Sequence, residues 1–179
     1  MTIRRKAWRS FFVVSVICLF FSACGGGVSA PKTPDGSEIT LFLLTDTGVT
    51  EKMKEPEQAD RNQVADQMSA VLKRLFQEGG YRTESVPAPD AFKPEARKLM
   101  VVLTVDETRS EDVYTQIATR LGTGVTHIRG TIEVFKDNHT LPVSRYTESI
   151  VSSRDWTVAA DELTKKLAKA ASDRINELY

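Results

Sequence analysis

The chain has 179 residues, and its 24 basic and 24 acidic residues give a formal net charge of zero. A balanced, mixed-sign charge argues against general binding of nucleic acid, for which a basic surface is expected. The only two cysteines, Cys18 and Cys24, lie close together near the N-terminus, so they offer the rest of the chain no disulfide.

Residues 1–23 are predicted to be a signal peptide. Four basic residues between positions 4 and 9 precede an apolar run from Ser10 to Ala23, and no acidic residue occurs before position 24. The run is 14 residues long, which is shorter than the roughly 18 residues that a membrane-spanning helix needs. A basic segment, an apolar segment and small residues before the cleavage point are the marks of secretion.

Cys24 follows this segment directly, after Ser22 and Ala23. That order resembles the lipobox of bacterial lipoproteins, which ends in a small residue and a lipidated cysteine. The resemblance implies cleavage between Ala23 and Cys24 and a diacylglycerol on the Cys24 thiol. Phe21 departs from the motif, where leucine is the usual residue. A plain signal peptide is the alternative, and it would leave Cys24 as an unpaired thiol in an oxidising compartment.

Cleavage after Ala23 would leave 20 basic and 24 acidic residues, a net charge of −4. A mildly acidic surface suits solubility in the periplasm. No second apolar segment is long enough to span a bilayer, so the lipid is the expected anchor. Gly25 stands where an aspartate would retain an enteric lipoprotein in the inner membrane, so the resemblance implies the periplasmic face of the outer membrane.

Residues 24–37 are predicted to be the lipidated cysteine and a flexible linker, because three glycines lead into a stretch rich in Ser, Pro and Gly. Residues 38–179 contain no second linker and no internal repeat. They are predicted to form a single periplasmic domain.

Apolar periodicity predicts the elements of this domain. A short apolar run over 38–45 indicates a buried strand, and a polar stretch over 46–58 indicates a loop. Helical spacing predicts a helix over 60–77 with one apolar stripe, which includes Val64, Met68 and Leu72, and Arg61 on the opposite, polar side.

The second half of the domain begins with the apolar run 99–105, which predicts a central strand. Alternation over 124–136 predicts a strand that turns at 137–140 and pairs back with 141–152 as a hairpin. Residues 157–178 carry an apolar stripe and predict a long helix, for which Asp155 or Thr157 is the expected N-cap.

With a short strand over 81–86, the predicted order is strand, helix, four strands and helix. Each amphipathic helix needs a face to cover, and one sheet with both helices on the same side satisfies both. We therefore predict an α+β domain, a two-layer sandwich with a mixed sheet of about five strands.

Gly122-Thr123-Gly124, the hairpin that follows it and the closing helix at Asp161 to Leu178 resemble a family of small bacterial lipoproteins of unknown function. The wider similarity is to curli-secretion-type and penicillin-binding-protein-activator-type lipoproteins and to the TolB amino-terminal domain. The resemblance covers residues 38–179. It implies a docking role in the envelope and transfers no catalytic residue.

Gly122-Thr123-Gly124 is also the stretch that could be taken for a phosphate-binding loop. Such a loop needs a helix after it, and here a strand is predicted. A bend or bulge at the start of the hairpin is the favoured interpretation.

Asp106, Glu107, Glu111 and Asp112 form an acidic cluster after the central strand. Calcium loops need ligands at alternating positions and a glycine for the turn, which the intervening residues do not provide. A solvated acidic loop is therefore predicted, and no metal or cofactor.

His127 and His139 are the two histidines, and neither has a nucleophile or a second histidine at motif spacing. Both are predicted to be structural or solvated, and no catalytic residue is assigned. Four aromatic residues could instead form an exposed patch for a partner, although packing in the core is favoured. They are Tyr114, Phe135, Tyr146 and Trp156.

The sequence therefore favours a non-enzymatic, lipid-anchored envelope module that docks onto a protein partner or assembles with itself. One alternative is an envelope hydrolase acting on wall or glycan through carboxylates such as Asp106 and Glu111. The other is a carrier of an apolar ligand held between helix and sheet. Two convergent carboxylates in a cleft would favour the enzyme, and an apolar cavity would favour the carrier.

Overall fold

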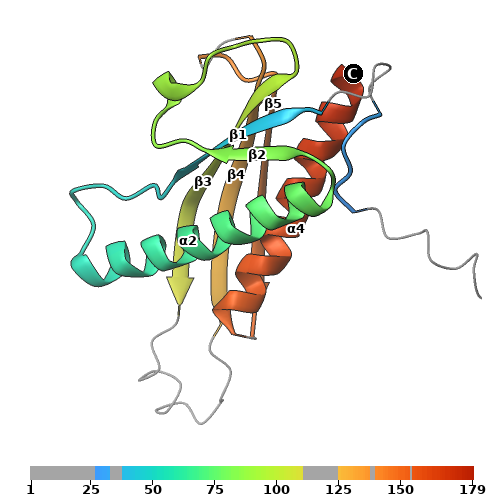
Figure 1. Cartoon of the computed structure of the whole chain (residues 1–179). Coiled ribbons are helices and arrows are strands. Elements are labelled where there is room, and N and C mark those ends of the chain that lie inside the picture. The colour runs from blue at the N-terminus through green and yellow to red at the C-terminus, as the bar shows by residue number, and fades with distance from the viewer. Residues whose placement is uncertain (1–26, 33–37, 111–124, 138–139, 154) are drawn as a thin grey trace, which may run out of the picture.

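The structure, a computed structural model, describes residues 27–32, 38–110, 125–137, 140–153 and 155–179 (Figure 1). In chain order its elements are β1 (Thr40–Asp46), α2 (Glu55–Glu78), β2 (Arg82–Ser85), the short 3-10 helix η1 (Pro89–Ala91), β3 (Lys98–Ser110), β4 (Thr126–Phe135), β5 (Ser144–Ser152) and α4 (Trp156–Leu178).

The five strands form one mixed sheet in the order β2-β1-β3-β4-β5. β1 is parallel to both of its neighbours, with Thr40 opposite Arg82 on β2 and Lys98 on β3. β3, β4 and β5 continue the sheet as antiparallel neighbours, so the predicted hairpin is present as β4 and β5. The predicted α+β class, the element order and the five-stranded mixed sheet are confirmed.

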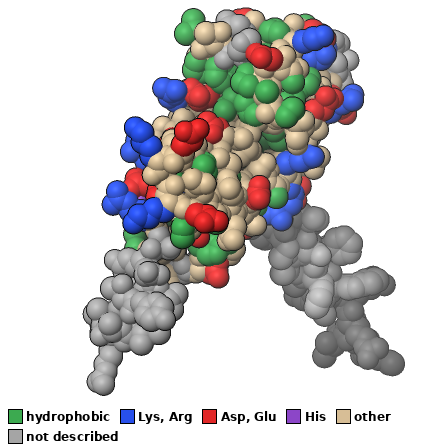
Figure 2. All heavy atoms as spheres, turned by 90° about the vertical axis from the view of Figure 1, so that its left-hand side faces the viewer, with side chains coloured by type: hydrophobic (Ala, Val, Ile, Leu, Met, Phe, Trp, Pro, Cys, Tyr) green, Lys and Arg blue, Asp and Glu red, His purple; other side chains and the backbone are tan. Residues whose placement is uncertain are grey.

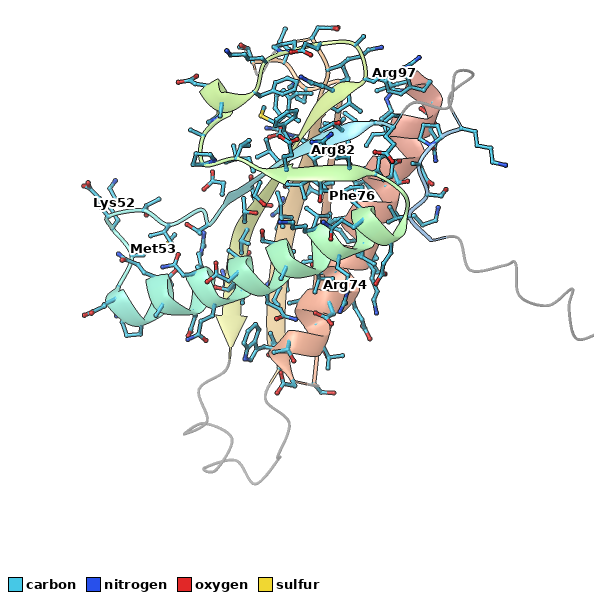
Figure 3. All side chains as sticks on the ribbon, in the orientation of Figure 1. Lys52, Met53, Arg74, Phe76, Arg82 and Arg97 are labelled. Atoms are coloured by element: carbon cyan, nitrogen blue, oxygen red, sulfur yellow. The ribbon has the colours of Figure 1, made fainter. Side chains whose placement is uncertain are left out.

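Both helices cover the same face of this sheet (Figure 1). α2 packs on α4 and on β3, while α4 packs on β4 and β5. The buried residues between the layers are aliphatic side chains from both helices and from β1, β3 and β4, together with Phe76 and Tyr81. Figure 3 shows Phe76 directed from α2 toward the strands and Arg74 directed away from them, as the predicted stripe requires.

α2 begins at Glu55, five residues before the predicted start. The prediction was wrong because Pro56 suggested a loop, whereas it occupies the first turn of the helix, where no backbone N–H is needed. Glu55 and Glu57 in that turn are favourable next to the positive end of the helix dipole. A second correction concerns Arg61, which is buried in the structure instead of lying on the polar side.

β3 runs to Ser110 and is longer than the predicted strand 99–105. Asp106 and Glu107, which were predicted to lie in a solvated loop, therefore belong to the strand. The pairing with β4 shifts by one residue between Val105 and Glu107, which marks a β-bulge. The second half of this strand was not predicted, because its acidic side chains interrupt the apolar pattern.

α4 begins at Trp156, and Asp155 is its N-cap. The Asp155 carboxylate accepts hydrogen bonds from the backbone N–H and the hydroxyl of Thr157, at 2.8 and 2.7 Å. These bonds hold the pKa of Asp155 below its ordinary value. The buried side of α4 also contains Thr164 and Ser172, which the apolar stripe did not predict.

A second, smaller apolar cluster lies on the sheet face that the helices leave open. Phe92, in the connection after η1, packs against Met100 and Phe135, and its ring centroid lies 5.6 Å from that of Phe42. Figure 2 shows hydrophobic side chains gathered at the upper end of one face, and polar and charged side chains below them. That upper end is where Figure 1 draws η1.

Residues 28–30, which fall within the predicted linker, lie against the domain. Val28 and Ala30 pack on the main core, and the Ala30 N–H donates to the carbonyl oxygen of Gly79 at 2.8 Å. Ser29 is hydrogen-bonded to Ser172 of α4. This part of the chain is therefore seated on the fold.

Candidate functional site

Several residues singled out from the sequence lie outside the described residues. They are Cys24, Glu111, Asp112, Tyr114, Gly122, Thr123, Gly124 and His139. Asp106, Glu107, His127, Phe135, Tyr146 and Trp156 are described. The proposed hydrolytic pair of Asp106 and Glu111 can therefore be judged on Asp106 alone.

Asp106 belongs to a small polar network on the open face of the sheet. Its carboxylate accepts a hydrogen bond from the Thr131 hydroxyl at 2.7 Å, and that hydroxyl lies 2.8 Å from the hydroxyl of Thr147. The three residues come from β3, β4 and β5, so the network links these strands side by side. The Asp106 carboxylate is therefore held by a structural hydrogen bond on the surface of the sheet.

His127 and Glu107 also lie on this antiparallel part of the sheet. His127 stands opposite Arg109 on β3 and Val151 on β5, and its side chain is half-buried. Glu107 forms an ion pair with Arg109. These contacts connect neighbouring strand residues and bring His127 no nucleophile among the described residues.

Arg61 is the one charged residue that is buried within the described part of the chain, with 7% of its surface exposed. Its Nη1 donates to the carbonyl oxygens of Gly48 and Val105, at 2.9 and 3.3 Å. Gly48 has φ +62°, and a Cβ there would lie 2.4 Å from the Val105 carbonyl oxygen. Arg61 therefore holds the β1–α2 connection against the bulge of β3.

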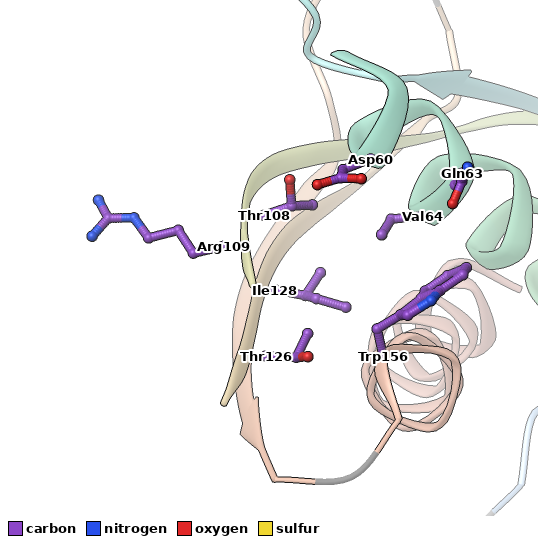
Figure 4. Close-up of a pocket in the computed structure, with 8 residues that line it drawn as sticks. All are labelled: Asp60, Gln63, Val64, Thr108, Arg109, Thr126, Ile128 and Trp156. Carbon is purple, nitrogen blue, oxygen red and sulfur yellow. The ribbon is translucent and has the colours of Figure 1, made fainter. Parts of the chain in front are cut away.

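A pocket of about 90 Å³ lies between the N-terminal half of α2, the start of α4, the last residues of β3 and the first residues of β4 (Figure 4). Trp156, Ile128, Val64 and Asp60 are among the residues that line it. Figure 4 shows the Arg109 guanidinium directed away from the other lining residues. Small-molecule sites usually enclose about 300–1,000 Å³, so this pocket has room for only a few water molecules.

The outer edge of β5 is the most exposed apolar feature of the sheet. β5 is the last strand in the sheet order and is nine residues long. Val151 is 65% exposed and Tyr146 39% exposed, and Leu141 in the preceding turn is 73% exposed. Within the described residues, no further strand covers this edge.

Tyr146, Glu148 and Lys166 form a chain of polar contacts beside this edge. The Tyr146 hydroxyl donates to Glu148 at 2.8 Å, and the Lys166 ammonium lies 3.5 Å from the same carboxylate. The Tyr146 hydrogen bond, followed by the charge of Lys166, holds the pKa of Glu148 below its ordinary value. The same hydrogen bond raises the pKa of Tyr146.

Of the four aromatic residues considered as a patch, the three that are described are dispersed in the structure. Phe135 is buried on the open face of the sheet, and Trp156 is half-buried against the main core. Tyr146 is the exposed member and lies on β5. The position of β5 at the edge of the sheet was not predicted from the sequence. Strand order is set by long-range pairing, which the alternation within β5 does not reveal.

No group of three or more His, Cys, Asp and Glu side chains is placed among the described residues to hold a metal ion. None of the helices in the same part of the chain is long and apolar enough to cross a membrane.

No family model matches the sequence, and no curated protein is significantly similar to it. Solved structures with a similar chain trace include the PelC dodecamer from Paraburkholderia phytofirmans, with 15% identity over 79% of this chain and 91% of that chain and a TM-score of 0.49. A lipoprotein from Neisseria meningitidis is 15% identical over 79% of this chain and 99% of that one, with a TM-score of 0.41. A minor lipoprotein from Acinetobacter baumannii is 12% identical over 75% and 93%, with a TM-score of 0.43. Each is a distant similarity.

Proposed function

We propose that this chain is a lipid-anchored envelope protein that acts as a non-enzymatic docking or assembly module, and that the outer edge of β5 is its docking surface. The observation that carries the proposal is the position of β5 as a nine-residue edge strand with exposed Val151 and Tyr146. An edge strand presents a row of backbone N–H and C=O groups to which another strand can be added.

The charges on β5 favour a second copy of the chain as the occupant. In an antiparallel pairing centred on Thr147, Tyr146 of one copy stands opposite Glu148 of the other, and Arg145 stands opposite Ser149. No like charges face each other in this register. A shift that centres the pairing on Glu148 would place two carboxylates opposite each other, which is destabilising. The charged residues therefore select a register as well as limiting unspecific pairing.

The hydrolase alternative finds less support, because Asp106 is engaged by Thr131 on an open sheet face. The pocket near Asp60 is also small compared with the space that a glycan unit requires. The carrier alternative needs room between helices and sheet, and the described interior there is filled by buried side chains such as Met68, Leu103 and Leu163.

The proposed location depends on the N-terminal sequence. A basic segment, a short apolar segment and Cys24 after Ser22-Ala23 support export and lipid attachment. Gly25 next to the cysteine supports delivery to the periplasmic face of the outer membrane. The domain then acts from the membrane surface.

The docking surface is tested by two opposite substitutions at Ser149, which is exposed and stands opposite Arg145 of the second copy in the proposed register. Ser149→Arg places like charges together twice, by symmetry, and we expect the dissociation constant to rise about tenfold. Ser149→Glu pairs with Arg145 and is expected to preserve or strengthen association. Sedimentation of the full lipoprotein in detergent over a range of concentrations measures both.

Val158→Lys is the control, because Val158 is an exposed apolar residue of α4. It should leave association unchanged. Thermal unfolding of each variant separates a loss of association from a loss of folding. A wild-type protein that stays monomeric at every concentration contradicts self-assembly. Crosslinking from Val151 in cells would then show whether a strand of another envelope protein occupies the edge.

A further inference from the structure

The N-terminal seat, formed by residues 28–30 on Gly79, Tyr81 and Ser172, is built from several independent contacts. The Tyr81 hydroxyl and the Ser172 hydroxyl both donate to the Ser29 carbonyl oxygen at 3.0 Å. The Ser29 N–H in turn donates to the Ser172 oxygen at 3.2 Å, and Ala30 is bonded to Gly79. Tyr81 and Ser172 are themselves buried.

Gly79 shows how closely the segment approaches the helix end. Its φ of −73° is open to any residue, so backbone conformation does not require glycine there. A Cβ at this position would, however, lie 2.8 Å from the Val28 carbonyl oxygen and 2.9 Å from its Cγ1. The space for a side chain at position 79 is therefore occupied by Val28. The N-terminal seat requires glycine at this position because any other residue would add a Cβ there.

The seat also shortens the connection to Cys24. Only residues 25–27 separate Cys24 from Val28, so the two Cα atoms can be at most about 14 Å apart. Were the whole segment free up to the start of β1 at Thr40, the reach would be about 55 Å. α2 alone is about 36 Å long, from 24 residues. A free segment would let any side of the domain meet the membrane, whereas the seated segment does not.

We propose that the N-terminal seat fixes the orientation of the domain on the bilayer, with the C-terminal ends of α2 and α4 facing the lipid surface. The inference rests on the proposed lipid attachment at Cys24. Residues 27–32 lie beside those helix ends, at the right of Figure 1. The N-terminal ends of α2 and α4 then point away from the membrane, and the pocket lies beside Trp156 at the start of α4.

The orientation is measured on full-length lipidated protein in vesicles of phosphatidylethanolamine and phosphatidylglycerol. Glu78→Cys and Glu57→Cys are a matched pair, because both are exposed residues on α2, near its opposite ends. Each is labelled with a fluorescent donor, and energy transfer to an acceptor in the lipid headgroups reports its distance from the membrane. We expect clearly stronger transfer from position 78 than from position 57.

Two variants separate the seat from other causes of orientation. Insertion of twelve Gly and Ser residues between Cys24 and Val28 restores a long reach and should remove the difference between the two positions. Tyr81→Phe combined with Ser172→Ala removes both donors to the Ser29 carbonyl without adding bulk. It should reduce the difference and speed hydrogen exchange at the Ala30 N–H on the order of tenfold. Circular dichroism confirms that the variants remain folded.

The outcomes distinguish this inference from the proposal on which it rests. Protein that fails to float with vesicles overturns lipid attachment, and the orientation with it. Protein that floats but gives equal transfer from positions 57 and 78 overturns the orientation alone. A difference that survives the twelve-residue insertion also overturns it, because contacts other than the seat would then orient the domain.

Discussion

Arg61 places a guanidinium among backbone carbonyl groups at the point where the β1–α2 connection meets β3. Within the described part of the chain its Nη1 donates to the carbonyl oxygens of Gly48 and Val105, and its Nε is buried without a partner. Hydrogen bonds from a charged donor are stronger than neutral ones. The residue therefore stabilises a connection that has little apolar surface to bury.

Arg61→Ala should lower the free energy of unfolding by about 2–3 kcal/mol, because it leaves two carbonyl groups without their donor. Urea denaturation measures the change. Arg74→Ala is the control, since Arg74 is exposed and lies 4.0 Å from Glu78 on the helix surface, and its loss should cost less than about 0.5 kcal/mol. Equal effects of the two substitutions would contradict the role given to Arg61.

The carboxylate of Glu148 should titrate below its ordinary value of 4.5, chiefly because of the hydrogen bond from Tyr146. A pKa that is lowered in the folded state stabilises the protein at pH values above the ordinary pKa. This contribution to stability is lost as the pH falls through the folded-state pKa. Tyr146→Phe should raise the pKa of Glu148 toward 4.5, and Lys166→Gln should raise it less. Carboxyl-carbon NMR titration measures both, and a larger effect of Lys166 would reverse the ranking.

At the scale of elements, α2 and α4 meet the sheet over Gly130 on β4. A Cβ at Gly130 would lie 3.3 Å from Leu167 Cδ1 on α4 and 3.4 Å from Met68 Cε on α2. Side chains from both helices therefore approach the backbone of β4 at this position. Leu167 fills the space that a side chain on β4 would otherwise use, and it is fully buried.

Leu167→Ala should cost about 2–5 kcal/mol, because it leaves a cavity above Gly130. Gly130→Ala alone should also destabilise, since its methyl group meets Leu167 and the Thr104 carbonyl oxygen at 3.3 Å. In the Leu167→Ala background the added methyl group has more room, and Gly130→Ala should cost less. Urea denaturation of the four proteins gives the coupling free energy, and strict additivity would show that the contact is not direct.

The periodicity of the sequence was enough to predict the helices and strands that bury one regular face. The stripe through Val64, Met68 and Leu72 and the alternation of β4 predicted which sides face the core. Element ends were predicted less well, because Pro56 and Asp106 suit both a loop and the places they occupy, a first helical turn and a bulged strand.

The features of the candidate surfaces depend on contacts far apart in sequence. Neither the burial of Arg61 nor the edge position of β5 follows from local pattern. The seating of Val28 and Ala30 had a weak signal, two apolar residues spaced for one side of an extended chain within a stretch rich in Gly and Ser. The composition of the stretch predicted a flexible linker instead, because stretches rich in Gly and Ser are usually flexible.

At the scale of the whole molecule, the proposed membrane attachment depends on Cys24, and the proposed choice of membrane depends on Gly25. Cys24→Ser should abolish incorporation of labelled fatty acid and leave the protein unprocessed or released from the membrane fraction. The lost anchoring is large, since each buried CH₂ group contributes about 0.8 kcal/mol. In the wild type, gradient fractionation should place the protein with outer-membrane markers.

Gly25→Asp is the matched variant, and it should move the protein toward inner-membrane fractions while leaving fatty acid incorporation unchanged. Wild-type protein that carries no fatty acid would show that Cys24 is not a lipid attachment site. Lipidated wild type found with inner-membrane markers would contradict only the assignment to the outer membrane.

The bond between Ser29 and Ser172 joins positions that are 143 residues apart. It can form only after nearly the whole domain has been synthesised and α4 has docked, because Ser172 lies in the last two turns of that helix. Until then the N-terminal seat lacks one of its partners. The enzyme that would modify Cys24, as proposed, therefore has its best access before folding ends, and late closure of the N-terminal seat would set the order of modification and folding.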